Sequence, residues 1–356
     1  MIPLFINSTA RYSGKSLLTL GMGLKFKRDG FRLGYFKPVG WLPVKMEGGI
    51  CDQDAFFMKK ALDLQEPLDH ICPVVMTQEL IQLAYEGKVQ DLGQKILNSF
   101  GLVCQDQDIV LVEGAGSLFE GGFVGARGIE LAAALDAKIL LIDWYHDGIA
   151  TIDSLLDAKE LVGDRLIGGL INRVAGDKID FVRKKVLPFL AHREIDILAV
   201  IPEEKILAAI SIRNLAEILY GSVICRGDRL DELVEGLMVG AMSMENALKY
   251  FQRQQNIVVI TGGDRLDIQL AALETPVKGI ILTGGFYPNE IIVTRAEERG
   301  VPLILVDQDT FAVVKRFDSI LGRLEFKEEK KIEKARDLIA QEVDFPLLYR
   351  RMGLSS

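Results

Sequence analysis

The stretch that most constrains the fold lies at 5–16, where an apolar segment runs into Gly-Lys-Ser and then into a helical pattern over 17–28. A loop that leaves a strand and opens a helix points backbone N–H groups and the positive helix end at one spot. Lys15 adds a charge there and Ser16 adds a hydroxyl, as in phosphate-binding loops. Thr9 stands where the full pattern has its first glycine, so an ordinary strand-to-helix turn is the alternative.

Length and composition predict a two-domain protein of the cytoplasm. The chain has 356 residues, 49% of them hydrophobic, which is enough for a core in each of two domains. Its net charge of -8 would repel DNA, RNA and anionic lipid, so we expect no nucleic acid and no membrane as partners. The four cysteines and three histidines are scattered, which indicates reduced thiols and neither a zinc site nor a disulfide scaffold. The N-terminus resembles neither a signal peptide nor a membrane span.

Apolar runs of strand length alternate with helical segments over the first half of the chain. The runs that predict strands lie at 31–39, 108–112, 137–142, 166–171 and 195–201, and a long helical stretch is expected over 78–100. The run at 108–112 is almost continuously apolar, as a strand buried on both faces requires. This alternation predicts an α/β fold with a doubly wound, mostly parallel sheet.

Charged side chains follow two of these strands at their carboxyl ends, where open α/β sheets bind ligands. Lys37 comes near the end of the run at 31–39 and serves such a ligand or is a solvated edge lysine. Glu113 follows the run at 108–112, and a carboxylate opposite a phosphate loop can hold Mg²⁺. A solvated acid at a strand end is the alternative for Glu113.

Two further positions allow a structural and a functional interpretation. Asp52 and Asp54 precede a predicted helix at 55–64, so either one caps that helix or reaches Mg²⁺. Asn172 follows the strand at 166–171 and has the donor and the acceptor needed to read a base edge. A turn-forming asparagine is equally expected there.

The second half of the chain repeats a Gly-Asp-Arg-Leu-Asp string at 227–231 and 263–267, and shorter βα units continue beyond it. A predicted strand runs into Thr-Gly-Gly twice, the second time at Thr283, Gly284 and Gly285. Two such turns could bind an anion that Arg265 clamps, or they are tight turns held by an Asp-Arg pair. The charged helix expected at 325–339 is solvated by default, with a homo-oligomer contact as the alternative.

Taken together, these motifs resemble a known family. The order of six separated motifs resembles the dethiobiotin synthetase-like branch of P-loop proteins, in the version found in the N-terminal part of long phosphotransacetylases. This resemblance covers 1–205, and 206–320 resembles the DRTGG domain, followed by a helical tail at 321–356. The motifs are Ser13-Gly14-Lys15-Ser16, Lys37-Pro38-Val39, Asp52-Gln53-Asp54, Glu113-Gly114-Ala115-Gly116, Ile171-Asn172-Arg173 and Ile201-Pro202.

The resemblance implies an ATP site with Mg²⁺, in which catalysis rests on positioning and charge neutralisation. Lys15 and Lys37 would be the catalytic lysines, and Asn172 would read adenine. The phosphates would bind at Ser13, Gly14, Lys15 and Ser16, Mg²⁺ would bind at Ser16, Asp54 and Glu113, and the DRTGG ligand would bind at Asp264, Arg265, Thr283 and Gly284.

Departures from the synthetase pattern fall on the substrate side. Arg11 and Tyr12 replace acidic or hydroxyl residues, Trp41-Leu42-Pro43 replaces small hydroxyl residues, and Ser117-Leu118-Phe119 follows Gly116. We therefore expect a Mg·ATP-binding regulatory protein whose second domain senses an unknown small molecule. The alternatives are an ATP-dependent ligase that activates a small carboxylate, and a scaffold without chemistry. The chain ends where a phosphotransacetylase catalytic domain would begin, so acetyl transfer is not expected.

Overall fold

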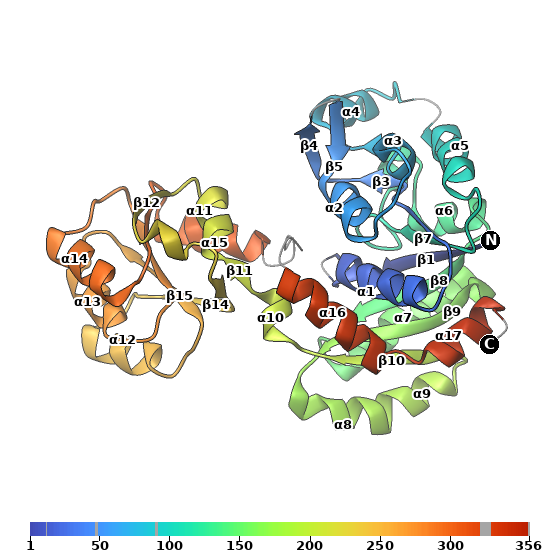
Figure 1. Ribbon diagram of the computed structural model, residues 1–356. Helices are drawn as coiled ribbons and strands as arrows, with labels where there is room; N and C mark the ends of the chain where they lie inside the picture. Colours follow the sequence, from blue (N-terminus) through green and yellow to red (C-terminus); the bar gives the residue numbers. More distant parts are fainter. Residues whose placement is uncertain (12, 47–48, 90–91, 321–328, 355–356) are drawn as a thin grey trace. The chain divides into compact units, whose positions relative to one another are not determined.

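The computed structural model describes residues 1–11, 13–46, 49–89, 92–320 and 329–354. The chain forms two compact units, coloured along the sequence in Figure 1. Unit 1 comprises Met1–Glu203 and Phe326–Ser356, and unit 2 comprises Glu204–Glu325. Along the chain, unit 2 is therefore inserted between two parts of unit 1.

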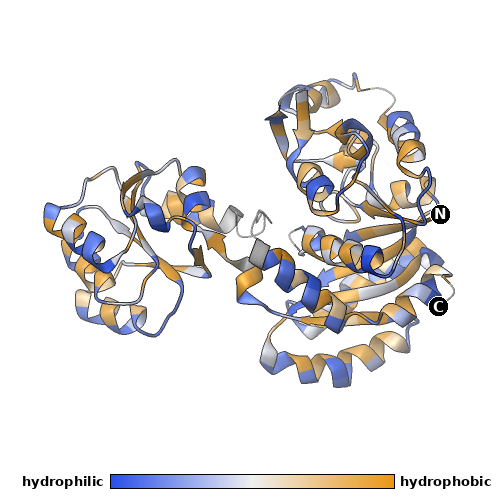
Figure 2. Cartoon of the chain, in the orientation of Figure 1, coloured by the Kyte–Doolittle hydropathy of each residue, from blue (hydrophilic) through white to orange (hydrophobic). Residues whose placement is uncertain are grey.

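Unit 1 is built on a six-stranded sheet with the strand order β10-β9-β8-β1-β7-β2. Every pairing in this sheet is parallel, which confirms the predicted α/β fold with a doubly wound, mostly parallel sheet. The central strands are buried because their residues are apolar on both faces, and they appear orange in Figure 2. The strands are β1 (Ile2–Ser8), β2 (Leu33–Phe36), β7 (Ile109–Glu113), β8 (Lys138–Trp144), β9 (Leu166–Val174) and β10 (Ile197–Pro202).

Along the chain of unit 1, helices alternate with these strands. They are α1 (Lys15–Arg28), α2 (Gln53–Ala61), α3 (Leu68–Ile71), α4 (Gln78–Tyr85), α5 (Leu92–Val103), α6 (Gly128–Ala134), α7 (Gly148–Val162), α8 (Ile179–Phe181) and α9 (Leu187–Ala191), with the π-helical turn η4 (Val182–Val186) joining the last two. The single helical stretch predicted over 78–100 is wrong, since α4 ends before Gly87. Gly87 has φ 67, a left-handed conformation that stops a helix.

Short strands outside the main sheet carry the chain from β2 to α2. Strand β3 (Val39–Gly40) pairs with β6 (Val74–Val75), and β4 (Pro43–Met46) forms an antiparallel pair with β5 (Gly49–Asp52). The β4–β5 pair returns the chain to the sheet edge, and α2 begins directly after it. It thereby brings Asp52 and Asp54 to Lys37 at the end of β2. The strands β4 and β5 are not among the predicted elements, whereas the resemblance implies that Asp54 belongs to the site.

The C-terminal helices α16 (Glu329–Glu342) and α17 (Phe345–Met352) belong to unit 1. Helix α16 packs along α1, and a Cβ on Gly21 of α1 would lie 2.6 Å from Ile339 Cγ1 (Figure 1). The expected solvated helix is wrong for one face of α16, because its apolar residues are buried and the helix packs on α1 and β10. These residues are Ala335, Leu338 and Ile339.

Unit 2 is a smaller α/β unit with the strand order β12-β17-β16-β15-β14, in which only β12 runs antiparallel. One face packs against α12, α13 and α14, and the other packs against α11 and α15. The five strands are β12 (Ser222–Cys225), β14 (Gly236–Val239), β15 (Ile257–Gly262), β16 (Gly279–Thr283) and β17 (Leu303–Leu305). A two-stranded sheet adds β11 (Ile210–Ser211) and β13 (Leu233–Val234), and the helices are α10 (Lys205–Ala208), α11 (Ile212–Ile218), α12 (Met244–Phe251), α13 (Leu266–Leu273), α14 (Glu290–Arg299) and α15 (Thr310–Ile320).

No helix within the described parts of the chain combines the length and the hydrophobicity needed to cross a membrane.

Candidate functional site

The candidate phosphate loop connects β1 to α1. Helix α1 begins at Lys15, and Gly14 before it has φ 90, a conformation that favours glycine. A Cβ on Gly14 would also lie 2.5 Å from Asn172 Nδ2, so both the backbone and the neighbouring side chain require glycine here. The turn therefore brings the N-terminus of α1, with its N–H groups, close to the carboxyl end of β1.

Lys15 is buried in this turn. Its Nζ donates to Ser8 Oγ at 2.8 Å and to the carbonyl oxygen of Gly116, which belongs to the loop after β7. Burial lowers the pKa of Lys15 to about 8, although the nearby Glu113 carboxylate acts in the opposite direction. The ammonium group is thus held by neutral acceptors, which an anionic ligand can replace.

Glu113 lies at the carboxyl end of β7 and is also buried. Its Oε1 accepts from Ser16 Oγ at 2.7 Å, and its Oε2 accepts from the Tyr35 hydroxyl at 3.0 Å. Burial raises the pKa of Glu113, and Lys37 opposes this effect. Glu113 is therefore a solvent-shielded carboxylate bonded to the first turn of α1, and the alternative of a solvated acid does not hold.

Lys37 is 4% exposed and lies among three carboxylates, so it is not a solvated edge lysine. Its Nζ is 2.6 Å from Asp54, 3.0 Å from Asp52 and 4.0 Å from Glu113. Burial alone would lower the pKa of Lys37, but these carboxylates outweigh burial and raise it. The lysine is thus a fixed positive charge at the end of β2.

The two aspartates before α2 have different partners. Asp52 caps α2 by accepting from Ala55 N at 3.0 Å, and it also accepts from Leu42 N at 3.0 Å. Asp54 is half-buried and faces Lys37. Asp52 therefore caps the helix, which is the structural interpretation given above for Asp52 or Asp54. Asp54 is the carboxylate with more freedom to bind a ligand.

These oxygen atoms form a donor set that suits Mg²⁺. A serine hydroxyl and carboxylates are the hard ligands that Mg²⁺ takes, with water and phosphate oxygens at its other positions. Ser16 and Glu113 are in direct contact, and Lys37 links Glu113 to Asp54. Their chemistry therefore fits the ion together with a nucleotide, although no group of three metal-binding side chains occurs in the described ranges.

Asn172 at the end of β9 uses its side chain within the protein. Its Nδ2 donates to the carbonyl oxygen of Ser13 at 2.8 Å, and its Oδ1 accepts from Arg173 N at 2.9 Å. The structure thus brings Asn172 to the phosphate loop, and adenine reading stays a prediction. Beside it, the Arg173 guanidinium lies 4.7 Å from the centre of the Trp144 ring, a contact that the sequence analysis missed.

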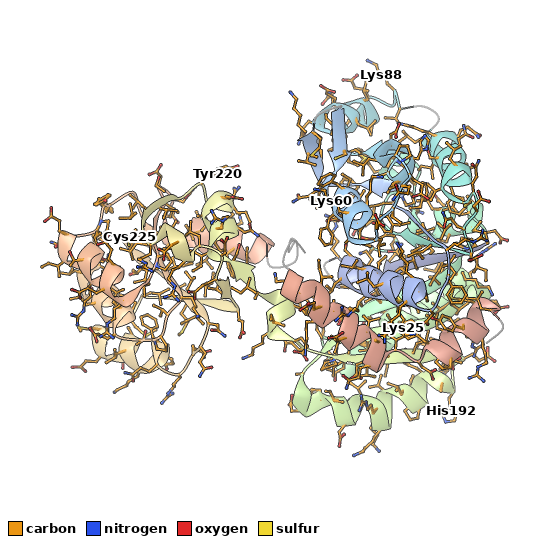
Figure 3. The ribbon with its side chains drawn as sticks, viewed as in Figure 1. Lys25, Lys60, Lys88, His192, Tyr220 and Cys225 are labelled. Carbon is orange, nitrogen blue, oxygen red and sulfur yellow. The ribbon has the colours of Figure 1, made fainter. Side chains whose placement is uncertain are left out.

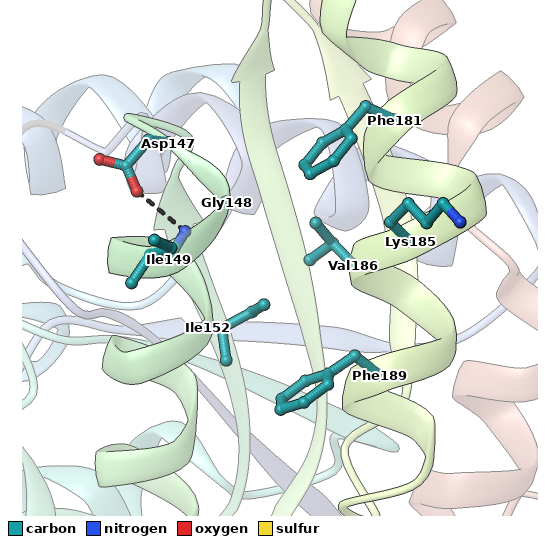
Figure 4. Close-up of a pocket in the computed structure, with 8 residues that line it drawn as sticks. All are labelled: Asp147, Gly148, Ile149, Ile152, Phe181, Lys185, Val186 and Phe189. Atoms are coloured by element: carbon teal, nitrogen blue, oxygen red, sulfur yellow. Dashed lines mark hydrogen bonds between the residues drawn. The ribbon is translucent and has the colours of Figure 1, made fainter.

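Other features of the chain are formed by residues that do not belong to this cluster. His192 belongs to unit 1 and Cys225 to unit 2 (Figure 3). A groove of about 400 Å³ between α7 and the α8–α9 segment is lined largely by apolar residues, among them Ile149, Phe181 and Phe189 (Figure 4). None of the predicted site residues lines this groove.

In unit 2, the structure brings the two glycine turns together. Gly263 N donates to the carbonyl oxygen of Thr283 at 3.0 Å, and Gly284 N donates to that of Gln308 at 2.9 Å, so both N–H groups are satisfied.

Arg265 makes a bidentate contact with Asp267 at 2.9 and 3.0 Å, which is an Asp-Arg pair at the turn. Asp264 is exposed at the same turn. The ligand role of Asp264, Arg265, Thr283 and Gly284 stays a prediction.

Comparison with known proteins gives two family matches. Residues 3–211 match the model described as AAA domain, and residues 214–320 match the model described as DRTGG domain. A phosphate acetyltransferase of Synechocystis sp. is 26% identical over 356 residues, covering 96% of this chain and 50% of the relative. A phosphate acetyltransferase of Pseudomonas aeruginosa is 23% identical, covering 98% and 52%. The chain spans about half the length of these curated relatives.

Among solved structures, the MinD cell division protein of Aquifex aeolicus is similar over 58% of this chain and 84% of its own. The identity is 17% and the TM-score is 0.35. At this TM-score the likeness adds nothing to the fold described above.

Proposed function

The chain belongs to the AAA-domain family, whose model matches residues 3–211, and on this premise we propose that unit 1 binds MgATP while the DRTGG domain senses a small ligand. The relatives are phosphate acetyltransferases, so we place the regulatory role in acetyl-phosphate or related metabolism. One observation carries the nucleotide proposal: the buried Lys15 and the Ser16–Glu113 contact meet at the N-terminus of α1.

In this proposal each residue of the cluster has a defined task. Ser13 and Gly14 contribute backbone N–H groups, and Lys15 contributes a charge to the phosphates. Ser16, Asp54 and Glu113 would hold Mg²⁺, which neutralises phosphate charge, and Asn172 would contact the adenine. Lys37 would place a positive charge beside the same ligand, at the carboxyl ends of the strands.

The magnesium part is tested with Ser16→Ala. At a nucleotide concentration 100 times the Kd, MgATP should stabilise the wild type by about 2.7 kcal/mol. The variant should lose the extra stabilisation that Mg²⁺ adds, while ATP with a chelator stabilises both proteins equally. Equal magnesium effects in the two proteins would remove Ser16 from the proposed ion site.

A second candidate function is an ATP-dependent ligase that activates a small carboxylate. The observation in its favour is Lys37, whose buried charge at the end of β2 suits a transferring phosphoryl group. This function requires ATP hydrolysis that depends on a second small molecule and falls in Lys37→Ala. Unchanged turnover in a variant that still binds MgATP would rule the ligase out.

A further inference from the structure

The segment 114–128, called here the loop 114–128, runs from the end of β7 to the first residue of α6. It is attached to the candidate phosphate loop by several polar contacts. Ser8 Oγ donates to the carbonyl oxygen of Gly116 at 3.2 Å, and Leu118 N donates to that of Ser8 at 2.8 Å. Lys15 Nζ donates to the same Gly116 oxygen. A ligand that binds the Lys15 ammonium therefore competes with a contact that holds the loop 114–128.

Glu120 of this loop adds an ionic contact to the same place. Its Oε2 accepts from Arg11 Nε at 2.7 Å, and Arg11 belongs to the phosphate loop. The Arg11 side chain is 55% exposed and that of Glu120 is 28% exposed, so water can reach the pair. The contact is a moderate, displaceable ion pair.

The Glu120 carboxylate lies close to Gly116, whose carbonyl oxygen contacts the candidate phosphate loop. A Cβ on Gly116 would lie 2.3 Å from Glu120 Oε2, and φ 64 at this position also favours glycine. The Gly116 carbonyl oxygen accepts from Lys15, so carboxylate, Gly116 and ammonium lie close together. Burial lowers the pKa of Lys15, and Glu120 is among the carboxylates whose charge opposes this effect.

We propose that Glu120 is an internal anion that keeps the loop 114–128 closed on the phosphate loop and competes with the phosphates of an incoming nucleotide. This inference rests on the proposed function and adds its regulation. Nucleotide phosphates would attract Lys15 and Arg11 and repel the Glu120 carboxylate, so binding opens the loop. The phosphates then replace Glu120 as the anion beside Arg11.

The test is Glu120→Gln, which keeps the shape of the side chain and removes its charge. The matched control is Glu130→Gln, since Glu130 is an exposed glutamate on the neighbouring α6. Because an exposed ion pair is weak, we expect Glu120→Gln to raise MgATP affinity about two- to five-fold and Glu130→Gln to leave it unchanged.

Hydrogen exchange of the amides at 114–128 gives a second readout. In the wild type, MgATP should speed their exchange, and in Glu120→Gln the exchange should already be fast before nucleotide is added. If the variant binds MgATP as tightly as the wild type or more weakly, the internal-anion role is wrong while the nucleotide site stands. If neither protein binds MgATP, the proposed function fails, and the competition fails with it.

Discussion

At the residue scale, the protonation state of Lys15 should set the pH dependence of nucleotide binding. Its pKa of about 8 in the free protein means that the ammonium loses its proton as the pH rises from 7.5 to 9.5. Phosphates bind the charged form, so the affinity for MgATP should fall roughly twenty-fold over this range, and binding near pH 8.5 should take up protons.

Calorimetric titrations in buffers with different ionisation enthalpies measure both quantities. An affinity that stays constant over this range, or a release of protons on binding, would contradict the assignment of Lys15 as the phosphate cation.

A site residue can be predicted from the sequence when the pattern that identifies it lies within a few neighbouring positions. Lys15, Glu113 and Lys37 stand at strand or helix ends within short patterns, and all three lie in the observed cluster. Arg11 and Glu120 are 109 positions apart, and only the folded loop brings them together. The sequence predicts Asn172 at the end of a strand, but its contact with Ser13 depends on the register of β9 and on the glycine turn.

At the element scale, the C-terminal helices hold the helix that follows the phosphate loop. The ring of Phe345 on α17 lies 6.0 Å from that of Phe26 on α1, and Asp344 N donates to the carbonyl oxygen of Leu198 in β10 at 2.9 Å. In the sequence, 345–349 is a short apolar segment, and nothing in its pattern indicates this partner. The partner is more than 300 positions away along the chain, beyond the reach of periodicity arguments.

This docking predicts a large loss of stability for Phe345→Ala. Phe345 is 4% exposed, so removing its ring should lower the free energy of unfolding of unit 1 by about 3–5 kcal/mol. The control is Phe311→Ala in unit 2, where the ring is 77% exposed and a change below about 0.5 kcal/mol is expected.

Denaturant unfolding with and without MgATP measures this effect, because the ligand identifies the transition that belongs to unit 1. Similar losses in the two variants would show that α17 does not hold unit 1 together.

At the scale of the whole molecule, a regulatory role requires that unit 2 respond to a metabolite. The proposal centres on Arg265, and acetyl phosphate is the first probe because the relatives are phosphate acetyltransferases. Acetyl phosphate should raise the melting temperature of unit 2 in the full-length wild type and not in Arg265→Ala. Arg213→Ala is the control, since Arg213 forms an exposed ion pair with Asp231 in the same unit.

If neither acetyl phosphate nor a panel of nucleotides shifts the melting temperature of unit 2, its ligand-sensing role fails. An equal shift in wild type and Arg265→Ala would place the ligand away from the glycine turns.

The central claim, that the turn between β1 and α1 binds nucleotide phosphates, is tested most directly by calorimetric titration of MgATP. The wild type should bind one equivalent with a Kd in the micromolar range, about 8 kcal/mol, and Lys15→Ala should show no binding. Lys27→Ala is the control, because Lys27 lies on the same helix α1 and donates to the carbonyl oxygen of Leu62 instead. The site is established if the wild type and Lys27→Ala bind MgATP and Lys15→Ala does not. The claim is contradicted if the wild type does not bind MgATP, or if Lys15→Ala binds it equally well.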